Sequence, residues 1–254
     1  MNEDAQHVIP TVSVIVPTLN EEQSIGRTLE ALTHAGGNIE VIVVDGGSND
    51  STTEIARRWG ARVIPSARGR GIQMHNGARV AQGQMLLFLH ADTTVPLNAI
   101  ERITEVLARD TAAVGGNFDI RFDGGSRAAR LMTWLYPKLE KIGLSYGDSG
   151  IFVRASVYAE IGGFNPFPIF EDANLVSRLK RRGRMVHLPV AVVTSSRRFE
   201  GRSFALTFAR WSIMQGLYWV GIPPRLLNQL YAPLRSAKVK DLESLQSGDR
   251  RNRP

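Results

Sequence analysis

The chain has 254 residues and a mass of 28.0 kDa, which fits one sizeable domain or one domain with an appendage. Hydrophobic residues make up 43% and charged residues 22%, a composition that excludes a wholly disordered chain. The absence of cysteine excludes a disulfide scaffold, a thiolate zinc site and a cysteine nucleophile.

The formal net charge is +7, and only five of the 31 basic residues are lysines, so 26 are arginines. The planar guanidinium of arginine suits phosphate and carboxylate partners. A basic balance of this kind is compatible with nucleic acid, with an anionic membrane surface and with a phosphorylated small molecule. Composition does not choose between these three classes of partner.

The sequence contains neither a secretory signal nor a spanning helix that we can identify. The first ten residues carry Glu3 and Asp4 and no apolar run, so a signal peptide is not expected there. A spanning helix needs about 18 uninterrupted apolar residues, and the nearest candidate is cut short by Pro223 and Pro224.

Strands and helices alternate in the first half of the chain. β-branched and apolar runs predict four buried strands, at residues 12–16, 40–44, 62–64 and 85–89. Apolar residues at helical spacing predict four helices between and after them, at residues 22–35, 51–59 with Ser51 as N-cap, 71–81, and from Pro96 onward. This order predicts an α/β fold, with a mostly parallel Rossmann-like central sheet and helices on both faces.

The second half is less regular. We predict strands at residues 113–120 and 185–193, a glycine-rich loop at 143–150, and helices at 127–142, 155–161 and 173–182. From residue 203 the chain is helical and aromatic, and after Pro233 it is polar and charged. We therefore place the end of the domain near Gly201, before a C-terminal helical appendage and a basic tail.

Polar residues follow three of the predicted strands. Pro17, Asn20 and Glu21 come after the first strand, residues 45–50 after the second, and residues 90–92 after the fourth. Ligands of open parallel sheets bind beyond the carboxyl ends of the strands. The coincidence of three clusters at such positions predicts a ligand site at this edge.

Each cluster also has a purely structural interpretation. Asp45 can accept hydrogen bonds from a ligand's base or ribose, or it can form the turn before Gly46. Asn20 and Glu21 can cap the helix that follows them. Asp92 can hold one Mg²⁺ or Mn²⁺ together with diphosphate oxygens, or it can be an ordinary loop aspartate.

Basic and acidic residues elsewhere leave similar alternatives. Arg68 and Arg70 lie in a glycine-rich entry to a helix, where backbone amides favour phosphate, although a flexible loop has the same composition. The pair Arg197 and Arg198 can clamp a diphosphate or belong to a solvated loop. The pair at 171–172 can cap the helix that it precedes, or supply a base if the helix start faces the cleft.

Together these pieces resemble an inverting family 2 glycosyltransferase of the GT-A fold. The resemblance runs in family order from about residue 12 to 198, and its set of motifs is specific although each motif alone is weak. The matching motifs are VSVIVPTLNEE (12–22), VIVVDGGSNDST (41–52), RGRGIQMHNGA (68–78), LLFLHADT (86–93), GDSGIFVRASVYAEIGGFN (147–165) and FEDANL (170–175). The third motif, together with TSSRRFEG (194–201), is similar to a bacterial subgroup of single-domain transferases.

The resemblance implies a domain at residues 10–200, with a nucleotide-binding half at 10–95 and an acceptor and catalytic half at 96–200, followed by the appendage and tail at 201–254. It implies Asp172 as the catalytic base and Asp92 as the ligand of Mg²⁺ or Mn²⁺. The implied acceptor-binding residues are Gly147, Asp148, Ser149 and Glu171. The implied donor-binding residues are Pro17, Asn20, Glu21, Asp45, Asp50, Arg68, Arg70, Gln73, His90, Ala91, Arg197 and Arg198.

The implied reaction is a single inverting transfer of a sugar from a nucleotide-diphosphate sugar to an acceptor hydroxyl. A UDP-sugar is the first expectation and a GDP-sugar the alternative, with a small-molecule or lipid-like acceptor. The base deprotonates the acceptor, and charge builds on the leaving diphosphate, where metal and arginines stabilise it. The QxxRW motif of processive synthases is absent, which argues against chain extension.

Two departures from the family pattern concern the metal. His90 stands where the family's DxD motif has its first acidic residue, and Ser195 stands where many relatives carry a metal-binding histidine. Metal binding by the free protein is therefore expected to be weak and to be completed by the diphosphate, with Arg197 and Arg198 neutralising part of the charge.

The appendage has a broad apolar face followed by basic residues. Packing on its own domain is the first interpretation, because apolar faces usually bury within a protein. The alternatives for residues 203–235 are peripheral contact with a membrane and a homodimer. The expected location is the cytoplasm, with the inner face of the membrane as the place of any peripheral contact.

Three other functional classes remain as alternatives. A sugar-phosphate nucleotidyltransferase shares the architecture but starts with a glycine-rich loop after the first strand, where this chain has Pro17 to Glu21. A catalytically degenerate nucleotide-sugar-binding protein would explain His90 and Ser195. Nucleic acid is not expected as a partner, because the chain has no recognised module or basic–aromatic stripe.

Overall fold

The computed structural model describes residues 11–141, 149–197 and 204–231. Its contacts divide the chain into two compact units: residues 1–166 with 171–201, and residues 167–170 with 202–254. The first unit contains every strand of the described residues. The predicted loop at residues 143–150 falls outside the described residues except for its last two positions.

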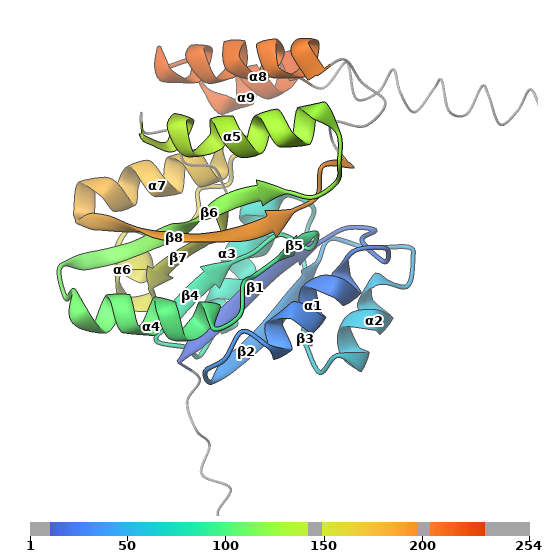
Figure 1. Cartoon of the computed structure of the whole chain (residues 1–254), viewed down its shortest axis with the longest axis vertical. Helices are drawn as coiled ribbons and strands as arrows, with labels where there is room; N and C mark the ends of the chain where they lie inside the picture. The colour runs from blue at the N-terminus through green and yellow to red at the C-terminus, as the bar shows by residue number, and fades with distance from the viewer. Residues whose placement is uncertain (1–10, 142–148, 198–203, 232–254) are drawn as a thin grey trace, which may run out of the picture. The chain divides into compact units, whose positions relative to one another are not determined.

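An eight-stranded sheet in the order β3-β2-β1-β4-β7-β6-β8-β5 forms the centre of the first unit (Figure 1). Its strands are β1 (Val12–Thr18), β2 (Ile39–Asp45), β3 (Arg62–Pro65), β4 (Met85–Phe88), β5 (Thr93–Thr94), β6 (Ala113–Phe122), β7 (Ile151–Arg154) and β8 (Arg184–Thr194). β3, β2, β1 and β4 run parallel, as do β6 and β8. β7 is antiparallel to both of its neighbours, and β5 is antiparallel to β8. The predicted mostly parallel sheet is confirmed.

Helices cover both faces of this sheet, as the sequence predicts. α1 and α2 pack side by side on one face, whereas α3 packs on β1 and β2 from the other face (Figure 1). The helices of the first unit are α1 (Ile25–Thr33), α2 (Thr52–Arg58), α3 (Arg70–Val80), α4 (Ala99–Arg109), α5 (Arg127–Lys141), α6 (Ala155–Glu160) and α7 (Glu171–Arg182).

The hydrophobic pattern accounts for the central strands. All seven residues of β1 are buried, as expected for a parallel strand covered on both faces. Gly77 lets α3 approach the sheet closely, because a Cβ at this position would lie 2.5 Å from Ile15 Cγ2 and 2.9 Å from Val44 Cγ2. This close packing fixes the start of α3 beside the carboxyl ends of β1 and β2.

A second packing layer joins α3 to α6 and α7. Phe88 of β4 lies against Tyr158 and Phe164, with ring centroids 5.4 and 4.9 Å apart. Leu175 and Leu179 of α7 are buried in the same cluster. These apolar residues anchor the helix whose first residues are Glu171 and Asp172.

Several predicted boundaries need correction. α4 begins at Ala99 rather than at Pro96, after Asn98 in the left-handed region with φ of 58°. α7 begins at Glu171, two residues earlier than predicted. Ser51 stands at the N-cap position of α2 but makes no side-chain cap bond. β5 and β7 were not predicted, because strands of two and four residues carry little periodic signal.

The second unit contains α8 (Phe204–Trp219) and α9 (Pro224–Tyr231). Residues 220–223 separate the two helices, and α9 begins at Pro224. Pro223 and Pro224 thus interrupt the apolar segment, as the sequence predicts. Within this unit, the rings of Phe170 and Tyr218 stack with centroids 4.8 Å apart. None of the described helices combines the length and the apolar character that crossing a membrane requires.

Candidate active site

The loops after β1, β2 and β4 meet at one edge of the sheet. Thr18 at the end of β1 is paired with Asp45 at the end of β2, and Leu89 after β4 donates its N–H to the Ile15 carbonyl at 3.1 Å. Because these strands are parallel, their carboxyl ends share one edge. The structure thus brings together the three polar clusters that the sequence singles out.

Asp45 is buried and accepts several hydrogen bonds from its own turn. Its Oδ2 accepts the backbone N–H groups of Gly47 and Ser48, both at 2.9 Å, and its Oδ1 accepts the Ser48 hydroxyl at 2.5 Å and the Thr18 hydroxyl at 3.3 Å. Burial acts to raise the pKa of Asp45, but these hydrogen bonds outweigh it and the pKa is lowered. The carboxylate is therefore held ionised and fixed in place.

Reciprocal hydrogen bonds join the β1 loop to the β2 loop. Asn20, which has a positive φ of 55°, accepts the Asn49 N–H at 2.9 Å through its side-chain oxygen. Glu21 donates its N–H to the Thr52 hydroxyl at 2.8 Å. The backbone strain at Asn20 is thus offset by a specific contact, since asparagine tolerates the left-handed region.

Asp50 completes this junction. It accepts the Thr52 N–H at 3.0 Å and the Glu22 N–H at 3.2 Å. Burial acts to raise the pKa of Asp50, but hydrogen bonds from Thr52 and Glu22 lower it overall. Asp50 therefore satisfies the start of α2, which is the role predicted for Ser51, and at the same time ties the β1 loop to it.

Arg197 links the first and third clusters. Its Nη2 lies 3.0 Å from Glu21 Oε2 and 3.3 Å from Asp92 Oδ2. Glu21 Oε2 also accepts the Ser24 hydroxyl at 2.6 Å. The pKa of Arg197 is raised first by the hydrogen bond to Glu21 and further by Asp92. One guanidinium nitrogen thus stands between two carboxylates from loops after β1 and β4.

β5 explains why Asp92 meets a residue that follows β8. Thr93 and Thr94, directly after Asp92, pair with Thr194 and Val193 of β8. The Thr93 and Thr194 hydroxyls are 2.9 Å apart. Asp92 is therefore fastened to the end of β8, three residues before Arg197.

The remaining residues of the third cluster are Ala91 and His90. Ala91 is buried and its carbonyl accepts the Thr28 hydroxyl of α1 at 2.8 Å. His90 is partly buried. Burial raises the pKa of Glu171, and His90 is among the charged groups that oppose this rise.

The start of α3 contributes two predicted donor residues with different surroundings. Gln73 is buried, and its amide donates to the Thr18 and Val44 carbonyls, both at 2.8 Å. Arg68 donates from Nε to the Gly46 carbonyl at 3.4 Å. Gln73 thus ties the ends of β1 and β2 together from beneath.

Arg70 and Glu171 join the start of α3 to the start of α7. Arg70 Nε lies 2.7 Å from Glu171 Oε1, and the Glu171 side chain is 2% exposed. The Oε2 atom of Glu171 is buried without a hydrogen-bond partner among the described residues. Gly71 permits this approach, because a Cβ there would lie 3.1 Å from Glu171 Cβ.

The burial of Glu171 shifts the pKa of its carboxyl group. Desolvation raises the pKa of Glu171, the neighbouring Asp172 raises it further, and Arg70 opposes the shift without cancelling it. Asp172 itself is partly buried, and its Oδ1 accepts the Ala173 N–H at 2.8 Å. The first turn of α7 therefore presents two adjacent carboxyl groups with different environments.

Ser149 is the one predicted acceptor residue of the 147–149 segment that the structure describes. It is fully buried, and its hydroxyl lies 3.5 Å from Asn117 Nδ2. Gly147, Asp148 and Arg198 lie outside the described residues. Pro17 is buried within β1, paired with Val44.

Hydroxyl side chains make many of the hydrogen bonds in this network, and no sequence pattern singles most of them out. Ser48 and Thr52 bind Asp45 and Asp50, while Ser24 and Ser195 bind the Glu21–Arg197 pair. Ser195 was noted only as a replacement for histidine. Its Oγ accepts from Arg197 Nε at 3.1 Å.

The donor atoms around Asp92 are of the kind that a divalent metal takes. Asp92 and Glu21 direct carboxylate oxygens toward one cationic atom of Arg197, and oxygen donors suit Mg²⁺ and Mn²⁺. Among the described residues, groups of three or more His, Asp or Glu that could hold a metal are absent. The described side chains therefore supply oxygen donors suited to such a metal but not a full set of ligands, so the remaining ligands would have to be diphosphate oxygens and water.

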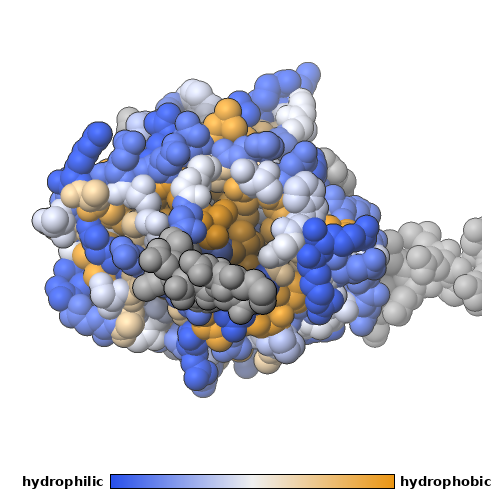
Figure 2. Space-filling model, turned by 90° about the horizontal axis from the view of Figure 1, so that it is seen from below, coloured by the Kyte–Doolittle hydropathy of each residue, from blue (hydrophilic) through white to orange (hydrophobic). Residues whose placement is uncertain are grey.

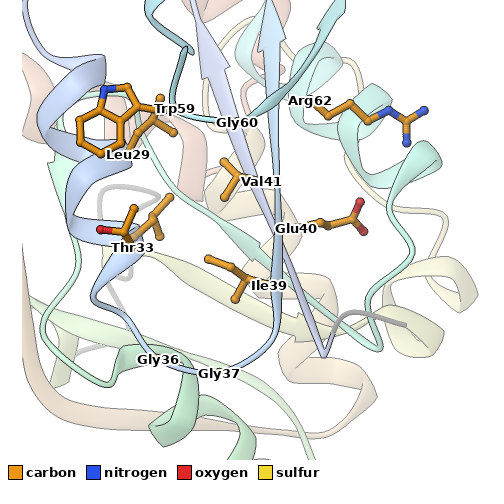
Figure 3. A pocket seen from close by; sticks show the side chains of 11 residues that line it. Leu29, Thr33, Gly36, Gly37, Ile39, Glu40, Val41, Trp59, Gly60 and Arg62 are labelled. Carbon is orange, nitrogen blue, oxygen red and sulfur yellow. The ribbon is translucent and has the colours of Figure 1, made fainter. Parts of the chain in front are cut away.

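Hollows lie elsewhere on the first unit. One, of about 490 Å³, is lined by Leu29, Ile39, Val41, Trp59 and other residues of α1, β2 and the α2–β3 turn (Figure 3). From the side on which β1 begins, hydrophobic residues gather in a depression with a hydrophilic rim (Figure 2). The charged cluster at the carboxyl edge, rather than one of these hollows, is the candidate active site, because it contains the residues able to bind phosphate and move protons.

The comparisons with known proteins agree with this architecture. Residues 13–159 match the model of the family described as Glycosyl transferase family 2, which is more than half of the chain. The chain belongs to this family, so the sequence-based assignment is confirmed.

Individual curated relatives share about a third of their aligned residues with this chain, over part of its length. The chain is 29% identical over 175 residues to glycosyltransferase AglE of Haloferax volcanii, covering 63% of this chain and 57% of the relative. It is 32% identical over 161 residues to an undecaprenyl-phosphate 4-deoxy-4-formamido-L-arabinose transferase of Edwardsiella ictaluri, covering 58% and 49%. The matches thus span only about half the length of these relatives.

A solved structure supports the fold. Glucosyl-3-phosphoglycerate synthase from Mycobacterium tuberculosis, crystallised with Mn²⁺, UDP and glucosyl-3-phosphoglycerate, superposes with a TM-score of 0.60 at 22% identity, covering 84% of this chain and 81% of that chain. This likeness confirms the GT-A fold predicted from the sequence.

Proposed function

We propose that the chain is an inverting glycosyltransferase that moves one sugar from a nucleotide-diphosphate sugar to an acceptor hydroxyl. The observation that carries the proposal is the convergence of Glu21, Asp92 and Arg197 at the carboxyl edge of a GT-A sheet. A diphosphate with a divalent cation needs both carboxylate and guanidinium groups, and this edge supplies both.

The donor nucleotide would lie against the β1 and β2 loops. Asp45 and Asp50 are held ionised by their hydrogen bonds, and Asn20 fixes the spacing of the two loops. A preformed rim of this kind orients a base and ribose with little reorganisation. We favour a UDP-sugar over a GDP-sugar, because UDP is the nucleotide bound in the superposed synthase.

Asp172 would act as the base. It would accept the proton of the acceptor hydroxyl on a carboxylate oxygen while that hydroxyl attacks the anomeric carbon on the face opposite the leaving diphosphate. Arg70, held by Glu171, would add positive charge near the leaving group. In this scheme Glu171 positions Arg70, and its contact with an acceptor remains a separate proposal, together with those of Gly147, Asp148 and Ser149.

Asp92, with Glu21 opposite, would hold a divalent Mg²⁺ or Mn²⁺ through carboxylate oxygens. When bound, the metal would neutralise charge on the leaving diphosphate. Arg197 and Arg198 would contribute to the same neutralisation, and Arg68 would approach the diphosphate from the start of α3. The superposed synthase contains Mn²⁺, which supports this part of the proposal.

We further propose a lipid-like acceptor and peripheral contact with the inner face of the membrane. The Edwardsiella relative is named for an undecaprenyl-phosphate acceptor. In the second unit, Trp219, Val220 and Leu226 are exposed, and both charged residues of 204–231, Arg210 and Arg225, are basic. Exposed aromatic and apolar groups beside basic ones suit an anionic lipid surface.

Vesicle flotation tests the membrane contact. The full chain should float with vesicles of phosphatidylglycerol and should float less after Trp219→Ser. Failure to float, combined with a dimer in light scattering, would favour the homodimer alternative for residues 203–235. In either case the protein would work in the cytoplasm.

Transfer of a radiolabelled sugar tests the reaction. Nucleotide-sugars would be incubated with the full chain, Mn²⁺ and a bacterial lipid extract, and label in the lipid phase would be measured. Asp172→Asn should lower transfer by about 10²–10⁴-fold and leave donor binding nearly unchanged. Transfer at the wild-type rate by Asp172→Asn would show that the base is a different residue.

The transfer assay and an assay of pyrophosphate release distinguish the two alternative classes of protein. If the chain is a degenerate binding protein, both the wild type and Asp172→Asn would bind the nucleotide-sugar and neither would transfer label. A sugar-phosphate nucleotidyltransferase would release pyrophosphate from a nucleoside triphosphate and a sugar phosphate, which the wild type is expected not to do.

A further inference from the structure

Arg197 contacts Asp92, the carboxylate that the proposed function assigns to a divalent metal. We propose that Arg197 is a built-in counter-cation for Asp92 and Glu21, which a divalent metal replaces at Asp92 only when a donor diphosphate offers Arg197 new partners. This inference rests on the proposed function, because it takes Asp92 as the metal ligand. It predicts strong coupling between metal binding and nucleotide binding.

The first observation is the sharing of one nitrogen. Nη2 of Arg197 contacts both Glu21 Oε2 and Asp92 Oδ2, at 3.0 and 3.3 Å. Asp92 is the carboxylate that the proposed function assigns to the metal, and Glu21 is the other carboxylate that this nitrogen contacts. A metal bound to Asp92 Oδ2 would compete for the same oxygen and would be repelled by the guanidinium charge.

The second observation is that neutral groups also hold Arg197. Its Nε donates to Ser195 Oγ at 3.1 Å, and Nη2 also lies 3.4 Å from Ser24 Oγ. Ser195 lies two residues before Arg197, so the end of β8 aims the side chain toward Asp92. The arrangement is thus built by several elements rather than being a chance surface contact.

The third observation concerns the ability of Arg197 to exchange partners. Its side chain is 44% exposed, whereas the side chains of Glu21 and Asp92 are 28% and 21% exposed. Partly exposed ion pairs are weak and exchange readily, whereas two phosphates would offer bidentate hydrogen bonds to the same guanidinium. Once Arg197 binds phosphate, Asp92 is free for the metal.

Calorimetric titration of Mn²⁺, with and without UDP, tests this exchange. For the wild type, Mn²⁺ alone should bind weakly and UDP should strengthen its binding. Arg197→Gln should bind Mn²⁺ alone about tenfold more tightly than the wild type, and UDP should then add less. Because coupling is reciprocal, Mn²⁺ should also enhance UDP binding less in this variant.

Arg68→Gln is the matched control for the loss of charge. It removes one arginine from the same edge of the sheet, but the described contact of Arg68 is with the Gly46 carbonyl rather than with a carboxylate. Its affinity for Mn²⁺ alone should change much less than that of Arg197→Gln. An equal gain in both variants would attribute the effect to net charge and overturn the proposal.

Two further outcomes separate this proposal from the proposed function. If UDP and Mn²⁺ bind the wild type together but Arg197→Gln gains no affinity for Mn²⁺ alone, the counter-cation role is wrong and the metal site stands. If neither the wild type nor the variant binds UDP or Mn²⁺, the proposed function is wrong. Should Arg197→Gln fail to fold, Arg197→Lys decides, because it keeps the charge but cannot reach all the same partners, and it should show a smaller gain in affinity of the same sign.

Discussion

Two regions of the candidate site differ in what their carboxylates contact: the loops after β1 and β2, and the charged centre formed by Asp92, Glu171 and their arginines. Asp45 and Asp50 are saturated by hydroxyl and backbone N–H groups of neighbouring residues. Asp92 and Glu171 instead face arginines. Under the proposed function, the first region would need no rearrangement to receive a nucleotide, whereas the second would exchange arginine for ligand. One side of the site is therefore preformed and the other is poised to respond.

The largest expected effect on stability comes from breaking the buried pair. Arg70→Gln would leave Glu171 buried beside Asp172 without its cation. We expect a loss of about 2 kcal/mol in the free energy of unfolding, below the cost for a fully buried pair because the Arg70 side chain is 47% exposed. Urea unfolding of the full chain measures this loss.

Two variants provide the controls for Arg70. Adding Glu171→Gln to Arg70→Gln should recover most of the lost stability, since the uncompensated charge is gone. Arg182→Gln breaks an exposed pair with Glu160 and should change stability much less. Equal losses for Arg70→Gln and Arg182→Gln would contradict the distinction between the charged centre and an ordinary surface.

A smaller effect is expected on the pH dependence of folding stability, to which the two regions should contribute with opposite signs. The pKa of Asp45 is lowered from its ordinary value of 3.8, so its contribution to stability is complete above 3.8 and is lost as the pH falls through the lowered pKa. The pKa of Glu171 is raised from 4.5, so its contribution is complete below 4.5 and is lost as the pH rises through the raised pKa.

Urea midpoints at several pH values test this prediction. Asp45→Asn should reduce the loss of stability that accompanies acidification below about pH 4. Glu171→Gln should reduce the loss that accompanies a rise in pH above about 4.5. If both variants changed the pH dependence of the urea midpoint in the same pH range and direction, the two carboxyl groups would not have contrasting environments.

Much of the architecture followed from local pattern. β1, β2 and β4 were predicted because short β-branched runs between turn residues are typical of buried parallel strands. The clusters after them were predicted to meet because parallel strands end at one edge. The positions of Asp45, Asp50 and Asp92 after predicted strands are therefore enough to single them out as candidate site residues.

What could not be predicted depends on contacts between distant parts of the chain. Arg197 was expected to meet a diphosphate, yet it contacts Glu21, 176 positions away, and Asp92, 105 positions away. The two-residue strand β5 that aligns them has no periodic signal. Asp50 took the capping role expected of Ser51 because two adjacent polar side chains compete for the same backbone groups.

The central claim is that a nucleotide diphosphate and a divalent cation bind at Asp92, and a titration of UDP in the presence of Mn²⁺ tests it most directly. The wild type should bind UDP, and Asp92→Asn should weaken that binding at least about tenfold, because a carboxylate ligand of the metal is lost. Asp119→Asn, which alters a carboxylate paired with His187, should leave the affinity unchanged. Equal UDP affinity in the wild type and Asp92→Asn would contradict the account.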